Sequence, residues 1–320
     1  MKKIVLVLLF PIIIHAQQNV IPRDTSFNIR STTTKIKKAY PYAETVKSEI
    51  PEGVQFFTNV VYASYGTREM QMDIFSPVSN EMHPAVLIIH GGGWRSGDKS
   101  MEWPTAQYLA SHGYVSATVE YRLSAEALYP AAVHDIKAAI RFLKANAEKY
   151  NIDIDKIAVS GCSAGGQLAA FLGTTGNLEK FEGLSGNMGF STAVQAVIVV
   201  DGTMDFTNPA ESNKDKDPAK PSGSKLWFGC SYEENPFPWI EASPINYINS
   251  KTPPFCFINS SLPKYHAGRD YAIEKFKFYN NYSEVHTIEG TPHPFWLFHP
   301  WFDKTMEYMI RFLDKTLKGK

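Results

Sequence analysis

Short, continuously apolar runs alternate along most of the chain with segments whose apolar residues recur every three or four positions. The apolar runs predict eight strands, at residues 54–63, 70–75, 86–90, 115–121, 157–160, 194–200, 255–258 and 284–288. Helical spacing occurs at residues 130–150, 167–173, 272–279 and 302–317. This alternation predicts an α/β fold, with a mostly parallel, twisted sheet of about eight strands and helices on both of its faces.

The first residues of the chain are typical of a secretory signal. Two lysines precede the apolar run 4–14, and the small residue Ala16 stands where a signal peptidase would cut. The run is shorter than the roughly 20 residues that span a bilayer. We therefore expect residues 1–16 to be removed and the protein to be exported, to the periplasm or the medium, without stable membrane insertion. An uncleaved anchor is the alternative, because the cleavage site is imperfect.

Two other segments depart from the alternation. Residues 17–50 are polar and include a run of threonines and lysines, which predicts an arm or linker with weak structure before a single catalytic domain over 51–320. Residues 206–243 interrupt the later strands with several prolines and aromatic residues. We expect them to form a short lid-like insertion that partly covers a site. A long loop without a role at the site is the alternative.

Composition excludes several classes of protein. The 320 residues include 32 Lys+Arg and 32 Asp+Glu, so no basic excess indicates a nucleic-acid partner or an anionic membrane. The apolar content of 44% is sufficient for a large core. Three cysteines allow at most one disulfide within the chain, and they are Cys162, Cys230 and Cys256. No zinc-site spacing occurs, so we expect neither a metal nor a cofactor.

One serine lies in a motif typical of a reactive nucleophile. The segment Gly161–Gly166 reads Gly-Cys-Ser-Ala-Gly-Gly and falls between a predicted strand and a predicted helix. In that context G-x-S-x-G makes a sharp turn that lifts the serine hydroxyl out of the sheet. We therefore expect Ser163 to be the nucleophile of an acyl-transfer reaction. Cys162 is an alternative because a thiol is more reactive, but its place before the apex should turn it back toward the sheet.

A glycine-rich segment supplies a second chemical signal. The sequence His-Gly-Gly-Gly-Trp at His90–Trp94 directly follows an apolar run. Backbone N–H groups that no side chain shields can stabilise the negative oxygen of a tetrahedral intermediate. We expect Gly92, Gly93 and Ala164 to supply them, with Trp94 beside them as a substrate contact or a purely structural residue. A flexible turn or a phosphate loop is the alternative, although no phosphate-binding glycine pattern is present.

A serine nucleophile requires a base and an acid that orients the base. His293 follows the last predicted strand, a position from which an imidazole reaches the carboxyl edge of the sheet, and His299 is its main rival. Three carboxylates after strands keep the chain order serine, acid, histidine, and they are Asp201, Asp205 and Asp270. We favour Asp270 as the acid, with Asp205 next, although Asp270 also stands where it would cap a helix.

Together these motifs resemble those of the α/β-hydrolase superfamily. The resemblance rests on His90–Trp94, Tyr121–Leu123, Gly161–Gly166 and Thr291–His293, and it covers the chain from about residue 54 onward. Within the superfamily the sequence is similar to bacterial carboxylesterases related to dienelactone hydrolases and feruloyl esterases. The resemblance implies an α/β-hydrolase fold and a Ser-His-Asp carboxylic-ester hydrolase that works through an acyl-enzyme. Many exported members remove acetyl, methyl or feruloyl groups from plant polysaccharides such as pectin or xylan.

Three other readings stay open beside that resemblance: a general small-acyl esterase or lipase, a serine peptidase of related fold, and a non-catalytic binding protein on a hydrolase scaffold. The sequence also departs from the family at the loop 259–269, which is longer than usual and puts the identity of the acid in doubt. Four basic residues flank the predicted site loops, namely Arg95, Lys99, Lys264 and Arg269. We expect one or more, with Arg269 first, to bind uronate carboxylates; surface solubility is the alternative.

Overall fold

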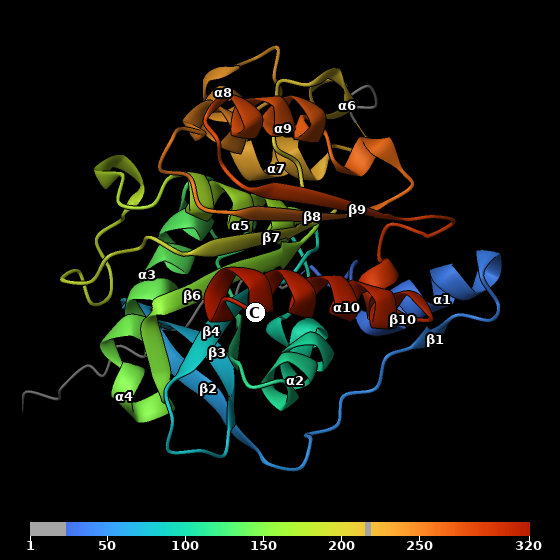
Figure 1. The fold of residues 1–320 in the computed structure, drawn as a ribbon. Helices are drawn as coiled ribbons and strands as arrows, with labels where there is room; N and C mark the ends of the chain where they lie inside the picture. Colours follow the sequence, from blue (N-terminus) through green and yellow to red (C-terminus); the bar gives the residue numbers. More distant parts are fainter. Residues whose placement is uncertain (1–23, 215–218) are drawn as a thin grey trace, which may run out of the picture.

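The computed structural model describes residues 24–214 and 219–320 (Figure 1). The expected signal segment, residues 1–16, lies outside the described residues. Within those described, no helix has both the length and the apolar character needed to cross a bilayer.

A twisted sheet of eight strands runs through the middle of the molecule (Figure 1). Its strands lie in the order β2, β3, β5, β4, β6, β7, β8, β9; β3 pairs antiparallel with both β2 and β5, and every other pair is parallel. The strands are β2 (Val54–Tyr65), β3 (Arg68–Pro77), β4 (His83–Ile89), β5 (Val115–Val119), β6 (Ile152–Cys162), β7 (Ala196–Val200), β8 (Phe255–Ser260) and β9 (Ser283–Ile288). All eight predicted strands are present, and the predicted α/β fold is confirmed.

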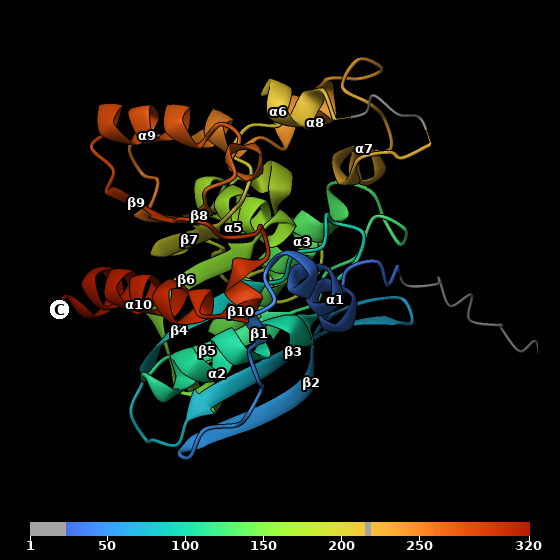
Figure 2. The ribbon, with the colours of Figure 1, turned by 90° about the vertical axis from the view of Figure 1, so that its right-hand side faces the viewer.

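Helices cover both faces of this sheet (Figures 1 and 2). One face carries α3 (Ala131–Ala145), α5 (Ala164–Thr174) and α9 (Arg269–Phe278), and the other carries α2 (Trp103–Ser111) and α10 (Trp301–Leu313). Alternate residues of a strand point to opposite faces. In β7, Val197 and Val199 accordingly join the core on the first face, whereas Ile198 joins the core on the second. The central strands are therefore apolar without interruption because both of their faces are buried.

The remaining elements are short. They are α1 (Ile29–Ala39), β1 (Glu44–Thr45), α4 (Ala147–Tyr150), α6 (Pro209–Ser212), α7 (Gly223–Phe228), α8 (Phe237–Glu241) and β10 (Phe298–His299). The expectation of weak structure before residue 51 is wrong for the described part of that segment. Asn28 caps α1 in a capping box with Ser31, Ile36 buries its side chain, and β1 pairs antiparallel with β10.

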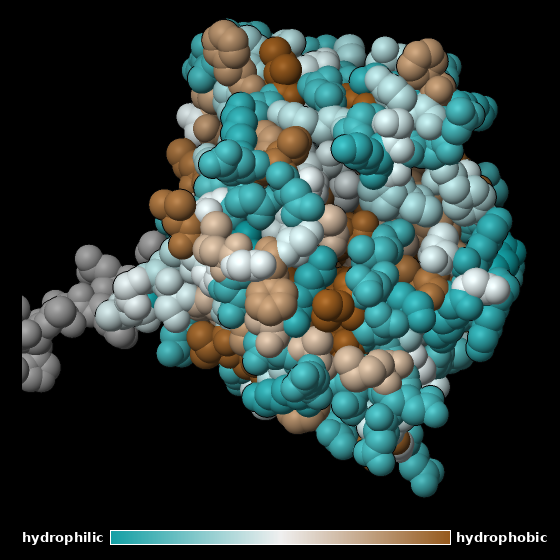
Figure 3. All heavy atoms as spheres, turned by 60° about the vertical axis from the view of Figure 1, so that its left-hand side comes forward, coloured by the Kyte–Doolittle hydropathy of each residue, from teal (hydrophilic) through white to brown (hydrophobic). Residues whose placement is uncertain are grey.

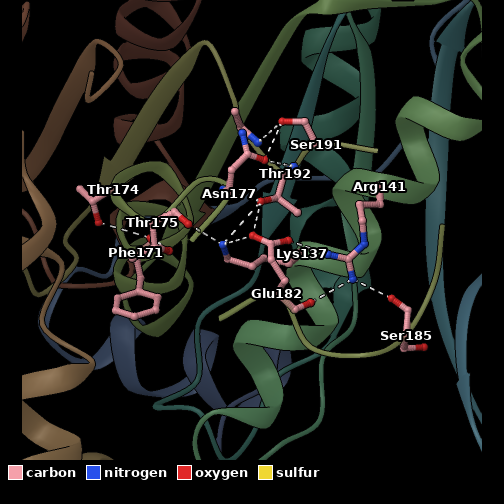
Figure 4. Close-up of polar contacts among 11 residues, drawn as sticks. Lys137, Arg141, Phe171, Thr174, Thr175, Asn177, Glu182, Ser185, Ser191 and Thr192 are labelled. Atoms are coloured by element: carbon pink, nitrogen blue, oxygen red, sulfur yellow. Dashed lines mark hydrogen bonds and ion pairs between the residues drawn. The ribbon is translucent and has the colours of Figure 1, made fainter. Parts of the chain in front are cut away.

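A buried group of charges fastens the segment after α5 to helix α3 (Figure 4). The ammonium of Lys137 donates to the carbonyl of Thr175 at 2.6 Å and to Glu182 at 2.8 Å. The guanidinium of Arg141 donates to the same carboxylate at 2.8 Å and to the Ser185 carbonyl at 2.6 Å. Both cations are essentially inaccessible to solvent, so removing Glu182 would leave two buried charges without their carboxylate.

The insertion at 206–243 packs through aromatic side chains. Trp227 and Trp239 are fully buried, and Trp227 stacks on Trp94 with ring centres 5.1 Å apart. A Cβ atom on Gly223, at the start of α7, would lie 2.8 Å from the carbonyl oxygen of Gly93. The described part of the insertion therefore lies directly against the glycine-rich segment. On the face drawn in Figure 3, by contrast, exposed hydrophobic side chains are dispersed among hydrophilic ones.

Candidate active site

Ser163 occupies the sharp turn between β6 and α5. Its backbone has φ 55° and ψ −118°, a combination that L-residues rarely adopt, and its N–H donates to the carbonyl of Val200 at 2.8 Å. The flanking glycines leave no room for side chains: a Cβ on Gly161 would lie 2.1 Å from Gly165 O, and one on Gly165 would lie 2.1 Å from Ile89 O. The strand–turn–helix geometry that the motif predicts is present.

The neighbouring Cys162 faces the opposite side of this turn. Its thiol is buried and lies 3.8 Å from Oε2 of Glu102, a carboxyl that also accepts a hydrogen bond from Trp296. Burial raises the pKa of Cys162 well above its usual value and raises the pKa of Glu102 to about 7. Cys162 is therefore held as a protonated thiol away from the nucleophile position. Like Cys230 and Cys256, it is not in a disulfide.

The glycine-rich segment lies against the nucleophile turn. A Cβ on Gly91 would come within 3.2 Å of the Cβ of Ser163, so the two loops are in contact. Gly92 and Gly93 both adopt positive φ angles, 122° and 60°, and a Cβ on Gly92 would lie 2.1 Å from the carbonyl of Ser96. Ala164 is the first residue of α5, and N–H groups at the start of a helix have no partner within it. The glycine-rich segment and the start of α5 therefore both adjoin the turn that carries Ser163.

His293 connects the serine to a carboxylate. Its Nε2 lies 2.8 Å from Oγ of Ser163, and its Nδ1 lies 2.9 Å from Oδ2 of Asp201. Burial lowers the pKa of His293 below its usual value, the ion pair with Asp201 opposes this, and the ammonium groups of Lys214 and Lys264 lower it further. The imidazole is therefore neutral and able to accept a proton at neutral pH.

The carboxylate beside His293 is Asp201, and the preference for Asp270 is wrong. Asp201 directly follows β7, has φ 47° and is completely buried, with hydrogen bonds from the backbone N–H and the hydroxyl of Ser260 at 2.9 and 2.6 Å. Asp270 lies in the first turn of α9 with 82% of its side chain exposed, and its carboxylate pairs with Arg269. The long loop before α9 carries Asp270 out to solvent instead of toward the histidine.

Asp205 and His299, the alternatives for the acid and the base, form their hydrogen bonds with other residues. Asp205 accepts hydrogen bonds from the backbone N–H and hydroxyl of Thr207, at 2.8 and 2.7 Å, and so closes a turn at the start of the insertion. His299 pairs with Asp303 at 3.0 Å on the surface of the molecule. Neither contacts Ser163 or His293.

The two predicted substrate contacts have structural partners. Trp94 is buried, and its indole N–H donates to Gln167 at 3.1 Å. Arg269 donates to Asn259 at 2.8 Å and pairs with Asp270, with only 14% of its side chain exposed. Arg269 therefore supports the strand end that holds Asp201 instead of presenting its guanidinium to a ligand.

Two aromatic residues against His293 were not predicted. Tyr265, in the short 3₁₀ helix Pro263–Tyr265, stacks on the imidazole with ring centres 3.5 Å apart and an interplanar angle of 12°. Trp296 contacts it edge-on, with ring centres 5.3 Å apart. The unusual length of the 259–269 loop was the signal in the sequence, because this loop brings Tyr265 over the histidine.

The arrangement has the parts that acyl transfer requires. A hydroxyl on a strained turn contacts a neutral imidazole, the imidazole contacts a buried carboxylate, and a glycine-rich segment lies against the turn that carries the hydroxyl. Such a set can move a proton from the hydroxyl to the imidazole while the hydroxyl oxygen attacks a carbonyl carbon.

Known proteins are similar to this chain in sequence and in fold. The chain spans less than half the length of the curated relatives it matches first. Esterase LipC of Mycobacterium tuberculosis is 29% identical over 179 residues, which cover 56% of this chain and 44% of LipC. Esterase LipQ of the same organism is 30% identical over 194 residues, covering 59% of this chain and 45% of LipQ.

Among solved structures, a truncated carbohydrate esterase from gut microbiota superposes with a TM-score of 0.71 at 25% identity, over 85% of this chain and all of that one. A bifunctional GH43-CE protein of Bacteroides eggerthii gives the same TM-score at 26% identity, over 82% of this chain and 38% of that one. These structures share the α/β-hydrolase fold predicted from the motifs. The BD-FAE family model matches residues 72–263. The chain therefore belongs to the BD-FAE family, within the α/β-hydrolase superfamily.

Proposed function

We propose that this protein is a serine carboxylic-ester hydrolase with Ser163 as nucleophile, His293 as general base and Asp201 as the acid that orients it. The observation that carries the proposal is the hydrogen-bonded series from Asp201 through His293 to Ser163, beside a loop of bare backbone amides. The esterase names of the relatives LipC and LipQ support the same chemistry.

The reaction has two acyl-transfer steps. His293 takes the proton of Ser163 as the hydroxyl oxygen attacks the ester carbonyl, and it then gives that proton to the departing alcohol. Water enters, loses a proton to His293 and attacks the acyl-enzyme, which releases the acid and restores the serine. Asp201 keeps Nε2 directed at the hydroxyl and stabilises the imidazolium that forms in each step.

The backbone amides of Gly92, Gly93 and Ala164 would stabilise the negative oxygen of each tetrahedral intermediate. Such donors cost no reorganisation when the charge develops, because the backbone already holds them in place. Removing one such donor in other enzymes costs about 3–4 kcal/mol in transition-state stabilisation. The steric limits at Gly92 support this role, since any side chain there would displace the loop.

We propose esters of plant cell-wall polysaccharides as substrates, with an acetyl, methyl or feruloyl group removed from pectin or xylan. The names of the structural neighbours support a carbohydrate ester: one is a carbohydrate esterase, and the other joins a GH43 unit to a CE unit. Hydrolysis confined to small acyl esters would instead favour a general esterase, and release of peptides would favour a peptidase.

The test compares wild-type protein with Ser163→Ala on 4-nitrophenyl acetate, and then on acetylated, methylated and feruloylated polysaccharides. We expect wild type to release 4-nitrophenol and the Ser163→Ala variant to lose that activity. Hydrolysis that survives the substitution at a wild-type rate would remove the proposed mechanism. The polymer panel, read out as released acetate, methanol or ferulate, identifies the group removed.

Export is also proposed, on the basis of the signal-like residues 1–16. Cell fractionation followed by mass spectrometry of the purified protein tests it. A mature chain that begins at Gln17, recovered from periplasm or medium, is the expected result, and an intact Met1 in a cytosolic fraction would contradict it.

A further inference from the structure

Of the four basic residues that flank the site loops, three have carboxylate partners within the protein. Arg95 pairs with Asp24 at 2.6 Å, and Arg269 pairs with Asp270. The third is Lys99, whose buried ammonium lies 2.6 Å from Oδ2 of Asp73. These three cations form ion pairs within the protein, so their charges are already balanced by carboxylates of the chain.

Lys264 differs from the other three. Its side chain is exposed, and within residues 24–214 and 219–320 no carboxylate lies at ion-pair distance from its ammonium. The ammonium lies over the ring of Tyr265, 4.9 Å from the ring centre. A cation in this position is fixed by the aromatic face while it keeps its hydrogen-bond donors free.

Tyr265 contacts both this charge and the imidazole of His293. Tyr265 stacks on His293 at 3.5 Å, so the ammonium of Lys264 is within about 9 Å of the imidazole, comparable with the Debye length of ~10 Å at 0.1 M salt. The charge of Lys214 also acts on His293, but its ammonium pairs with the buried carboxylate of Glu211. Of these two lysines, Lys264 is therefore the one whose ammonium has no carboxylate partner among the described residues.

We propose that Lys264, held by Tyr265, forms a subsite for a carboxylate of the substrate, and that the preferred substrate is an acyl ester on a uronic-acid sugar. The inference rests on the proposed function. The contacts of Lys264 with Tyr265 and of Tyr265 with His293 put the ammonium within about 9 Å of the imidazole that serves Ser163, so a carboxylate near the reacting ester lies within the range of its charge. Lysine acts here as a point charge, without the planar pairing that arginine gives.

A positive charge at such a subsite should raise kcat/KM for anionic esters, because their carboxylate contacts it in the transition state. Neutral esters lack that contact, so their kcat/KM should not depend on it. Because Lys264 is exposed, water partly screens the contact, and its removal corresponds to a loss in kcat/KM of roughly two- to fivefold. The diagnostic quantity is therefore the ratio of kcat/KM for an anionic ester to that for a neutral ester of the same acyl group. This ratio cancels any general effect of a substitution on His293.

The experiment measures that ratio with an acetylated oligogalacturonide and an acetylated xylo-oligosaccharide, with 4-nitrophenyl acetate as the common reference. The variants are Lys264→Ala, Lys264→Glu and Lys264→Arg in the full chain. Lys251→Ala is the matched control, because Lys251 is exposed and precedes β8 at the end of that strand remote from Asp201.

We expect wild type to prefer the oligogalacturonide, Lys264→Ala to lower the ratio roughly two- to fivefold, and Lys264→Glu to lower it further. Lys264→Arg should keep most of the ratio, and Lys251→Ala should not change it. Addition of 0.5 M NaCl should lower the ratio in wild type and in these two variants, which keep a cation at position 264, but not in Lys264→Ala. An unchanged ratio in Lys264→Ala, or no wild-type activity on the oligogalacturonide while 4-nitrophenyl acetate is hydrolysed, would overturn the subsite. A protein inactive on every ester, the reference included, would instead contradict the proposed function on which the subsite rests.

Discussion

The hydroxyl of Ser260 lies 2.6 Å from Oδ2 of Asp201, the carboxylate oxygen that also faces Nδ1 of His293. The last residue of strand β8 therefore supports the acid, and the acid itself directly follows the neighbouring strand β7. Asn259 adds a longer contact of 3.4 Å to the other carboxylate oxygen. Because Asp201 accepts these hydrogen bonds in a fully buried position, it is held in one orientation toward the histidine.

Substitutions at two aspartates distinguish this assignment. Asp201→Asn should lower kcat on 4-nitrophenyl acetate by a factor on the order of 10³–10⁴, because an amide favours the wrong imidazole tautomer and cannot stabilise its cation. Asp270→Asn is the matched control and should stay within a factor of about two of wild type, because the Asp270 carboxylate is exposed and pairs with Arg269 instead of His293. Equal losses in the two variants would contradict the role of Asp201.

The acid limb of the pH–rate profile reports His293. Because burial and the nearby ammonium groups lower its pKa, the imidazole stays neutral at pH values where an ordinary histidine, with a pKa of about 6.5, is already half protonated. Activity should therefore persist below pH 6.5 and fall only as the pH drops through the lowered pKa. Measured kcat/KM values between pH 4 and 8 test this, and a limb centred above pH 6.5 would contradict it.

Glycine at position 165 is required by its surroundings. In Gly165→Ala the new Cβ would meet the backbone oxygen of Ile89 at 2.1 Å, which neither chain segment can relieve without moving the nucleophile turn. We expect a loss of about 3 kcal/mol or more in the free energy of unfolding, with loss of activity. Gly189→Ala, where nothing lies within 4 Å of the added methyl, should match wild type. Urea denaturation of both variants makes the comparison.

The buried carboxyl of Glu102 should make stability depend on pH. Its pKa rises from 4.5 to about 7 on folding, chiefly through burial, so the folded state holds this proton more tightly than the unfolded chain. The contribution to stability is complete below pH 4.5 and is lost as pH rises to about 7, a change on the order of 3 kcal/mol. Glu102→Gln should lack this loss. The test is the wild-type minus variant difference in unfolding free energy, measured from pH 4.5 to 8; a difference that does not vary with pH would contradict it.

Most of the sheet was predictable because its signal is local. Continuous apolar runs are required wherever both faces of a strand are buried, and Val86 and Val197 lie in such runs. Helix α2 was missed because several of its buried positions are small or polar residues, such as Ala106 and Gln107, so the helix lacks a clear apolar spacing. Tertiary packing, more than helical propensity, holds that helix in place.

The same distinction between local signals and tertiary packing applies to the residues of the site. Ser163 and the glycine-rich segment carry local signals, because the strained backbone conformations there need glycine neighbours. The acid carries none, since three aspartates follow strands in the required order and only the path of the 259–269 loop separates them. That loop turns Asp270 to solvent and places Tyr265 over His293.

The amino-terminal segment 24–50 contacts the chain close to the glycine-rich segment and also close to His293. Asp24 pairs with Arg95, two residues beyond Gly93, and β1 pairs with β10, which begins shortly after His293. Neither contact lies within the eight-stranded sheet. Proteolytic removal of this segment should therefore abolish activity while the central sheet remains folded. An intact amino-terminal segment is thus a practical criterion for the quality of a purified sample.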